Sequence, residues 1–145
     1  MTDFGVGYHG DRTGAAEVSG RLWVSLQRDY ASGYAARGRA GRVVEVNLSG
    51  LRVLDLRPLG ISGDGAEWDE DQGCIVDPVL DAGLADALRD AGVSARRLGH
   101  GEMHQRVAAI ADALTVAGYD AVAIQEWTDG IGEADTVCIL RWAQP

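Results

Sequence analysis

The chain contains no lysine, and all 13 of its basic residues are arginine. Aspartate and glutamate together number 22, which gives a net charge of -9. Sequence-independent affinity for nucleic acids depends on clustered cations that neutralise phosphates, so this balance counts against a nucleic-acid partner. The one dense basic cluster consists of Arg37, Arg39 and Arg42. These arginines could face a dinucleotide pyrophosphate, or they could belong to a solvated loop between a helix and a strand.

Cysteines and long apolar runs are also scarce. The two cysteines, Cys74 and Cys138, lie too far apart for a metal-ligand or redox motif, so we expect free thiols in a reducing compartment. Cys138 is expected in a core strand. No window approaches about 18 consecutive apolar residues, and the first residues lack the basic and apolar segments of a secretory signal. We therefore expect a cytoplasmic protein with no membrane partner.

Several organising features are missing as well. There is no internal repeat and no linker long enough to divide domains. Glycine-rich nucleotide-binding turns of the GxGxxG or GxxxxGKS type do not occur, and neither does a nucleophile elbow, so a hydrolase triad has no support. With 145 residues, 46% of them hydrophobic, the chain can bury roughly two-thirds of its unfolded surface. The sequence predicts a single domain, residues 1–145.

The first half of the chain predicts short strands around one helix. Residues 28–37 read as a helix that Gly38 ends. Residues 60–76 read as a glycine-rich, acidic loop with an exposed Trp68, and long loops of this kind often carry function. Residues 7–10 and 22–26 are predicted as short strands. The apolar and β-branched residues 43–48 and 51–56, joined at Ser49-Gly50, predict two strands or one strand with a bend.

The second half predicts two amphipathic helices and a hairpin. Asp77 is a good N-cap with Pro78 at the first helical position, and the apolar stripe that follows ends at Gly92. A second apolar stripe begins at Met103 and ends at Gly118. The closing hairpin is predicted to pair strands over residues 120–126 and 136–142 around a long polar tip, residues 127–135.

This order of elements fits an α+β domain in which two small sheets pack together with helices outside. It does not fit a doubly wound nucleotide-binding fold.

Four segments of the chain, taken in order, carry a family resemblance. They are Tyr8-His9-Gly10, Trp23-Val24-Ser25, the helical Tyr30-Ala31-Ser32-Gly33-Tyr34-Ala35 and the late Gly118-Tyr119-Asp120. The order resembles the ADP-ribosyltransferase superfamily, of the type that includes poly-ADP-ribose polymerases and diphtheria toxin. Similar layouts occur in RES-domain NAD-consuming toxins and in a phage anti-CRISPR ADP-ribosyltransferase. The resemblance implies a split cleft between two sheets that binds NAD as a substrate.

The resemblance also implies roles for individual residues. His9 would hydrogen-bond the adenosine-side ribose, and the backbone of Gly10 would hold the nicotinamide carboxamide. Ser25 matches the small hydroxyl that follows in the family. Tyr34 would stack on the nicotinamide ring, with Tyr30 in a supporting role at the cofactor.

The catalytic carboxylate implied by the family is assigned to Glu126, at the end of a late strand. Loss of nicotinamide leaves an oxocarbenium-like ribose, and a carboxylate on its 2'-hydroxyl stabilises the developing charge. Glu133 ranks second for this role and Asp129 third, because Glu126 best fits the strand end.

A metal centre is the competing interpretation of one segment. His100 and His104 flank Glu102 and could share a helix face. Gly99 and Gly101 disfavour a helix there, and no third ligand has a fixed spacing, so we expect no metal site.

Three functions follow from these observations. The resemblance predicts an enzyme, a mono-ADP-ribosyltransferase acting on a macromolecule as a bacterial toxin, phage effector or anti-defence factor. The partners would then be NAD and a protein acceptor or, in a toxin–antitoxin pair, an antitoxin. One alternative is an NAD glycohydrolase or phosphorylase toxin of RES type. The other is a degenerate, non-catalytic module that binds a protein through residues 60–76.

Overall fold

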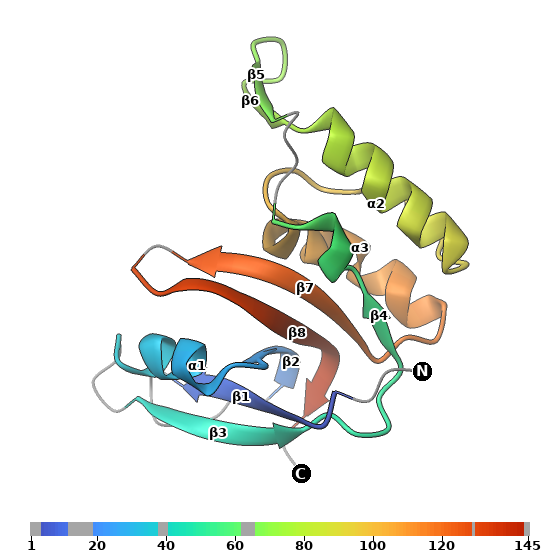
Figure 1. Cartoon of the computed structure of the whole chain (residues 1–145). Coiled ribbons are helices and arrows are strands. Elements are labelled where there is room, and N and C mark those ends of the chain that lie inside the picture. The colour runs from blue at the N-terminus through green and yellow to red at the C-terminus, as the bar shows by residue number, and fades with distance from the viewer. Residues whose placement is uncertain (1–3, 12–18, 38–40, 62–65, 129, 144–145) are drawn as a thin grey trace.

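Six strands from both ends of the chain form one mixed sheet (Figure 1). The computed structural model describes residues 4–11, 19–37, 41–61, 66–128 and 130–143. Neighbouring strands run antiparallel, except that β4 and β7 are parallel. In spatial order the strands are β3 (Arg42–Asn47), β1 (Val6–Asp11), β2 (Ser19–Ser25), β8 (Gly132–Ala143), β7 (Ala121–Thr128) and β4 (Val53–Asp55).

This arrangement confirms the α+β class and corrects one feature of the expected architecture. The main strands do not form two small packed sheets, because β2 pairs with both β1 and β8 and so joins the two halves of the chain. The junction is narrow. Among the described residues, Tyr8 opposite Ser25 is the one register pair between β1 and β2. The sheet also curves, since Val46 of β3 shares a core cluster with Ala123 of β7 although other strands separate them.

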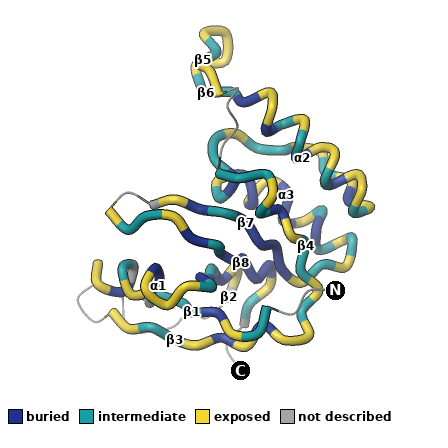
Figure 2. The backbone as a smooth tube through the Cα atoms, viewed as in Figure 1, coloured by how far each residue is buried: buried dark blue, intermediate teal, exposed yellow. Residues whose placement is uncertain are grey.

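Two helices cover one face of the sheet, α2 (Pro78–Asp90) and α3 (Met103–Val116). Their predicted apolar stripes are buried against β7 and β8, whose central residues form the dark blue interior in Figure 2. Cys138 lies in this core, as predicted, and both cysteines are free. The cluster contains Leu80, Leu84, Leu88, Met103, Val107, Ile110, Leu114, Val122, Ile124, Cys138 and Leu140.

The ends of α2 and α3 follow from local chemistry. The Asp77 side chain accepts a hydrogen bond from the Leu80 backbone N–H at 2.9 Å, which confirms the predicted N-cap. Arg106 of α3 is 1% exposed, pairs with Asp81 of α2 and donates from Nε to the Gly101 carbonyl at 2.9 Å. This buried guanidinium fixes the two helices against each other. Across the described ranges, no helix is both long and apolar enough to cross a membrane.

The region predicted as a loop over residues 60–76 contains a small hairpin. Beyond a 3-10 turn, η1 (Arg57–Leu59), the strands β5 (Glu67–Asp69) and β6 (Cys74–Val76) form a separate two-stranded sheet that projects from the body of the domain (Figure 1). The Asp69 side chain accepts backbone N–H bonds within the turn, and Gly73 supplies a φ of 67° there. Trp68 is 62% exposed, as expected.

The predicted long tip of the final hairpin is also corrected. β7 and β8 stay paired as far as Thr128 opposite Gly132, so most of residues 127–135 are strand. Gly130 and Gly132 adopt φ values of 80° and 110°, which allows the chain to reverse tightly. The hairpin is therefore long enough to extend over α1 (Arg28–Ala35), which contacts β1, β2, β3 and β8 (Figure 1).

Candidate functional site

A buried polar group lies where α1 meets the sheet. Tyr30 of α1 donates its phenolic hydrogen to Oε1 of Glu126 on β7, with an oxygen–oxygen distance of 2.7 Å. The two residues are 96 positions apart in the sequence. Tyr30 is 6% exposed and Glu126 is 8% exposed. A buried carboxylate needs hydrogen-bond partners, and the short Tyr30 contact supplies one to a single oxygen.

Two further polar side chains share this face of the sheet. Side chains alternate along a strand, so Thr136 lies on the same face of β8 as Ala134, the residue opposite Glu126. Ser25 of β2 is directly opposite Thr136. Ser25 and Thr136 are each 3% exposed. We call Ser25, Tyr30, Glu126 and Thr136 the α1 cluster.

The hydrogen bonds inside the α1 cluster are incomplete. Within the described ranges, no residue other than Tyr30 hydrogen-bonds the Glu126 carboxylate. The Thr136 hydroxyl is buried and has no hydrogen-bond partner among those same residues. Most buried polar side-chain atoms in proteins have a partner, so the Thr136 hydroxyl calls for an explanation.

Close packing holds α1 over this face. A Cβ atom added to Gly33 would stand 3.0 Å from a methyl carbon of Ile131, at the turn between β7 and β8. At the start of the helix, the Gln27 backbone N–H donates to Ser25 Oγ at 3.0 Å. The guanidinium carbon of Arg28 lies 5.5 Å from the centre of the Tyr8 ring on β1. These contacts fix the position from which Tyr30 reaches Glu126.

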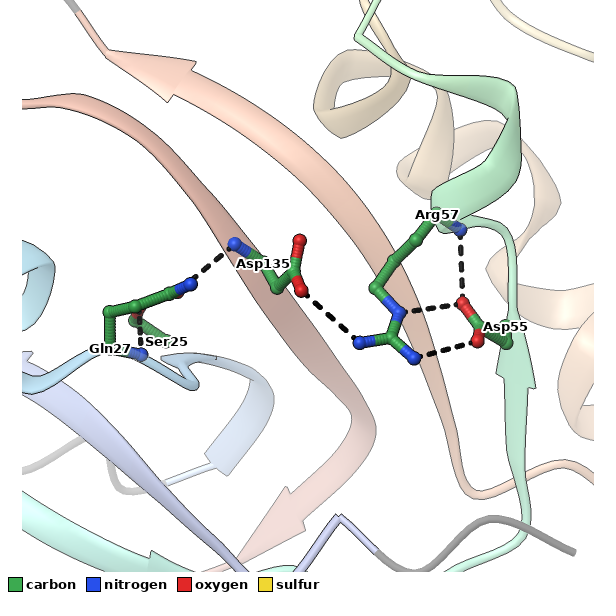
Figure 3. A network of polar contacts seen from close by, with 5 residues as sticks. All are labelled: Ser25, Gln27, Asp55, Arg57 and Asp135. Carbon is green, nitrogen blue, oxygen red and sulfur yellow. Dashed lines mark hydrogen bonds and ion pairs between the residues drawn. The ribbon is translucent and has the colours of Figure 1, made fainter.

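A second polar network connects Ser25 to the edge of the sheet (Figure 3). The Gln27 side-chain oxygen accepts from the Asp135 backbone N–H at 3.1 Å, and Arg57 Nη1 donates to Asp135 Oδ2 at 3.2 Å. Arg57 also makes a bidentate contact to both oxygens of Asp55, at 2.9 and 2.8 Å. Asp135 precedes Thr136 and therefore faces the other side of the sheet. Through Asp135, the network holds β8 from the face of the sheet opposite the α1 cluster.

Charge pairing shifts two pKa values in this network. The guanidinium of Arg57 hydrogen-bonds the Asp55 carboxylate and lowers its pKa, which outweighs the effect of partial burial. The same hydrogen bonds raise the pKa of Arg57. Both groups are therefore charged at neutral pH, as a structural ion pair requires.

The structure places His9 apart from the α1 cluster. Its Nδ1 lies 2.7 Å from the Trp23 carbonyl oxygen, and since a carbonyl only accepts, Nδ1 carries the hydrogen. A Cβ atom added to Gly7 would touch the Val24 side chain. Side chains alternate along a strand, so His9 lies on the same face of β1 as Gly7 and on the opposite face from Tyr8. Gly10 is paired with Val43 of β3.

The remaining candidates are one tyrosine and two carboxylates. Tyr34 belongs to α1, but its side chain lies outside the described residues. Glu133 is exposed and sits opposite Trp127, so it lies on the reverse face of the hairpin from Glu126. Asp129 lies outside the described residues. Of the carboxylates considered, the structure brings Glu126 to the buried cluster and leaves Glu133 away from it.

Sequence reasoning missed Thr136 and gave Tyr30 only a supporting role. Thr136 stands in an apolar, β-branched run, where a threonine is an ordinary strand residue. Only the register of β8 against β2 and β7 shows what surrounds it. Tyr30 and Tyr34 are one helical turn apart, so spacing alone favours neither.

The histidines considered as metal ligands and an open cavity lie away from the α1 cluster. His104 Nδ1 is 3.4 Å from Glu102 Oε2, and the described part of the chain holds no group of three or more potential ligands among His, Cys, Asp and Glu. A cavity of about 450 Å³ opens between the β5–β6 hairpin and the start of α3, beside Cys74 and His100. It does not include the α1 cluster.

Comparison with known proteins gives no match, whether to family models, to curated proteins or to solved structures. Function is therefore inferred from the residues themselves. Among them, the Tyr30–Glu126 contact is the strongest observation, because it joins a buried carboxylate to a hydroxyl from a distant segment.

Proposed function

We propose that this chain is an NAD-dependent mono-ADP-ribosyltransferase that modifies a macromolecule, with Glu126 as its catalytic carboxylate. The observation that carries the proposal is the Glu126 side chain itself. It is 8% exposed, one oxygen is held by Tyr30, and the other has no hydrogen bond from any described residue. This fits a carboxylate that is positioned in advance and keeps one oxygen for a ligand.

The reaction would break the bond between ribose C1' and the nicotinamide nitrogen. The bonding electron pair leaves with nicotinamide, and an oxocarbenium-like charge develops on the ribose. Glu126 would accept a hydrogen bond from the ribose 2'-hydroxyl and stabilise that charge in a site with little water. An acceptor nucleophile then bonds to C1' and gives up its proton.

Tyr30 would be a positioning residue in this scheme. Its hydroxyl sets the place of Glu126 Oε1, so the second oxygen presents a fixed lone pair to the sugar. Tyr34, on the next turn of α1, keeps the proposed stacking role at the nicotinamide ring. His9 lies on the opposite face of the sheet with its Nδ1 held by the Trp23 carbonyl, so this scheme gives no role to His9 or to Gly10.

A protein acceptor or antitoxin is the partner that the surface favours. Trp68 and Ile75 face each other across the β5–β6 hairpin and are 62% and 56% exposed. Exposed aromatic and aliphatic side chains side by side are typical of surfaces that bind proteins. With water as the acceptor, the same site would act as an NAD glycohydrolase.

Nicotinamide release from NAD tests the proposal. Glu126→Gln should keep NAD affinity within a few-fold and lower turnover by a factor on the order of 10² or more, because the stabilisation appears mainly as charge develops. Glu133→Gln is the matched control on the reverse face of the hairpin and should retain cleavage. Full cleavage by Glu126→Gln together with an inactive Glu133→Gln would contradict the assignment.

The fate of the ribosyl group separates the related activities. NAD labelled in its adenosine moiety should transfer label to a macromolecule if the chain is a transferase. Release of free ADP-ribose without transfer would identify the glycohydrolase instead. A wild-type protein that neither binds nor cleaves NAD would refute both and favour a non-catalytic module.

A further inference from the structure

One hydroxyl in the α1 cluster, that of Thr136, makes no hydrogen bond to any described residue. Thr136 is 3% exposed, and its Oγ1 has no hydrogen-bond partner within the ranges that the structure describes. Leaving a hydroxyl unpaired in the interior is destabilising, while valine would fill nearly the same volume without that penalty. A threonine at this position is therefore not explained by the stability of the fold.

The register places Thr136 diagonally across from Glu126, the catalytic carboxylate of the proposed reaction. Thr136 is opposite Ile124, and Glu126 lies two residues further along β7 on the same face. Diagonal neighbours of this kind stand roughly 7–8 Å apart, close enough for two polar side chains to contact one small ligand. Ser25 is opposite Thr136 on the other side, but its Oγ accepts from Gln27 N–H, so it is already occupied.

We infer that Thr136 is a ligand-binding residue whose hydroxyl hydrogen-bonds the ribose hydroxyl adjacent to the one bound by Glu126. This inference rests on the proposed function, because it takes the nicotinamide-side ribose of NAD as the ligand. The vicinal 2'- and 3'-hydroxyls of a ribose offer two neighbouring donors and acceptors. Glu126 takes the 2'-hydroxyl through its second oxygen, and Thr136 takes the 3'-hydroxyl.

Reaching Thr136 requires α1 to shift outward from the β7–β8 hairpin. The contact to be loosened is the packing of Gly33 on Ile131, while the Tyr30–Glu126 hydrogen bond is kept. Helix α1 is 8 residues long, and its hydrogen-bond contact with β7 is the single Tyr30 hydroxyl within the described ranges. Such a shift on binding is a modest rearrangement for a ligand-binding element.

Thr136→Val separates ligand binding from folding. The variant should bind NAD about 3- to 10-fold more weakly, the range expected for one neutral hydrogen bond. Its melting temperature without ligand should rise by about 2–4 °C, because the unpaired hydroxyl is removed. Thr136→Ser keeps the hydroxyl and should keep the affinity. Thr115→Val is the control, since Thr115 Oγ1 already donates to the Ala111 carbonyl at 3.0 Å in α3.

An NAD analogue that lacks the 3'-hydroxyl on the nicotinamide ribose completes the test. Wild-type protein should lose the same factor of affinity for the analogue that Thr136→Val loses for NAD. The variant with the analogue should show no further loss, because both changes remove one contact.

Three results would overturn the inference or its basis. A wild-type protein that does not bind NAD contradicts the proposed function. NAD binding that is equally tight in wild type and Thr136→Val overturns the role of Thr136 alone. A lower melting temperature for Thr136→Val than for wild type would show that the hydroxyl already has a partner in the free protein, which also overturns it.

Discussion

Tyr30→Phe removes one hydroxyl and leaves the aromatic ring, so it isolates the contact on which the α1 cluster depends. The Tyr30 hydroxyl is the hydrogen-bond partner of a carboxylate that is 8% exposed. A hydrogen bond to a charged group contributes about 1.5–3 kcal/mol, and the carboxylate left behind stays buried. We therefore expect the free energy of unfolding to fall by about 1.5–3 kcal/mol, which lowers the melting temperature by roughly 5–10 °C in a chain of this length.

Urea denaturation measures this loss, with an unchanged m-value showing that the native state stays compact. Tyr119→Phe is the matched control, because among the described residues the Tyr119 hydroxyl makes a single, long contact of 3.4 Å to the Ala91 carbonyl. The control should cost well under about 1 kcal/mol. In a double-mutant cycle with Glu126→Ala, which removes the acceptor, the two changes should be strongly non-additive. A Tyr30→Phe protein as stable as the control, or additive losses, would refute the contact as the support of Glu126.

Two more predictions concern ionisable groups. Burial raises the pKa of the Cys138 thiol to about 12, and the charge of Glu126 adds to this rise while that of Arg21 opposes it. Iodoacetamide at pH 8 should therefore alkylate only Cys74 until the protein is unfolded. Two alkylated cysteines in native protein would contradict that burial. Asp55 has a lowered pKa because of Arg57, so its contribution to stability is complete above the unfolded-state value of about 3.9 and is lost as pH falls through the folded value. Below about pH 5, the unfolding free energy of Asp55→Asn should therefore fall less steeply with pH than that of wild type; parallel curves would contradict the ion pair.

Local signals explain which parts of the fold could be predicted from the sequence. The N-cap of Asp77 and the stop at Gly118 depend on neighbouring residues, so α2 and α3 have nearly their expected bounds. The β5–β6 hairpin was missed because its strands are only three residues each and lie among glycines and acids. The tip of the final hairpin was overestimated because its polar residues continue the pairing of β7 and β8.

The candidate site depended on contacts between distant segments, which periodicity does not contain. The strand end at Glu126 pointed to a carboxylate, and the structure buries it. Which tyrosine reaches that carboxylate depends on how α1 lies against the hairpin, and the answer is Tyr30. The unpaired hydroxyl of Thr136 follows from a register that joins β2, β8 and β7. No single stretch of sequence encodes that arrangement.

A crystal structure with a carbocyclic NAD analogue, which cannot lose nicotinamide, would show whether Glu126 binds the ribose of NAD. The quantity to measure is the distance from the carboxylate oxygens of Glu126 to the 2'-hydroxyl of the nicotinamide-side ribose. We predict a hydrogen bond of about 2.7 Å from that hydroxyl to Glu126, with the nicotinamide ring beside α1. An analogue bound away from α1, or a ribose held by Glu133 on the reverse face of the hairpin, would contradict this prediction.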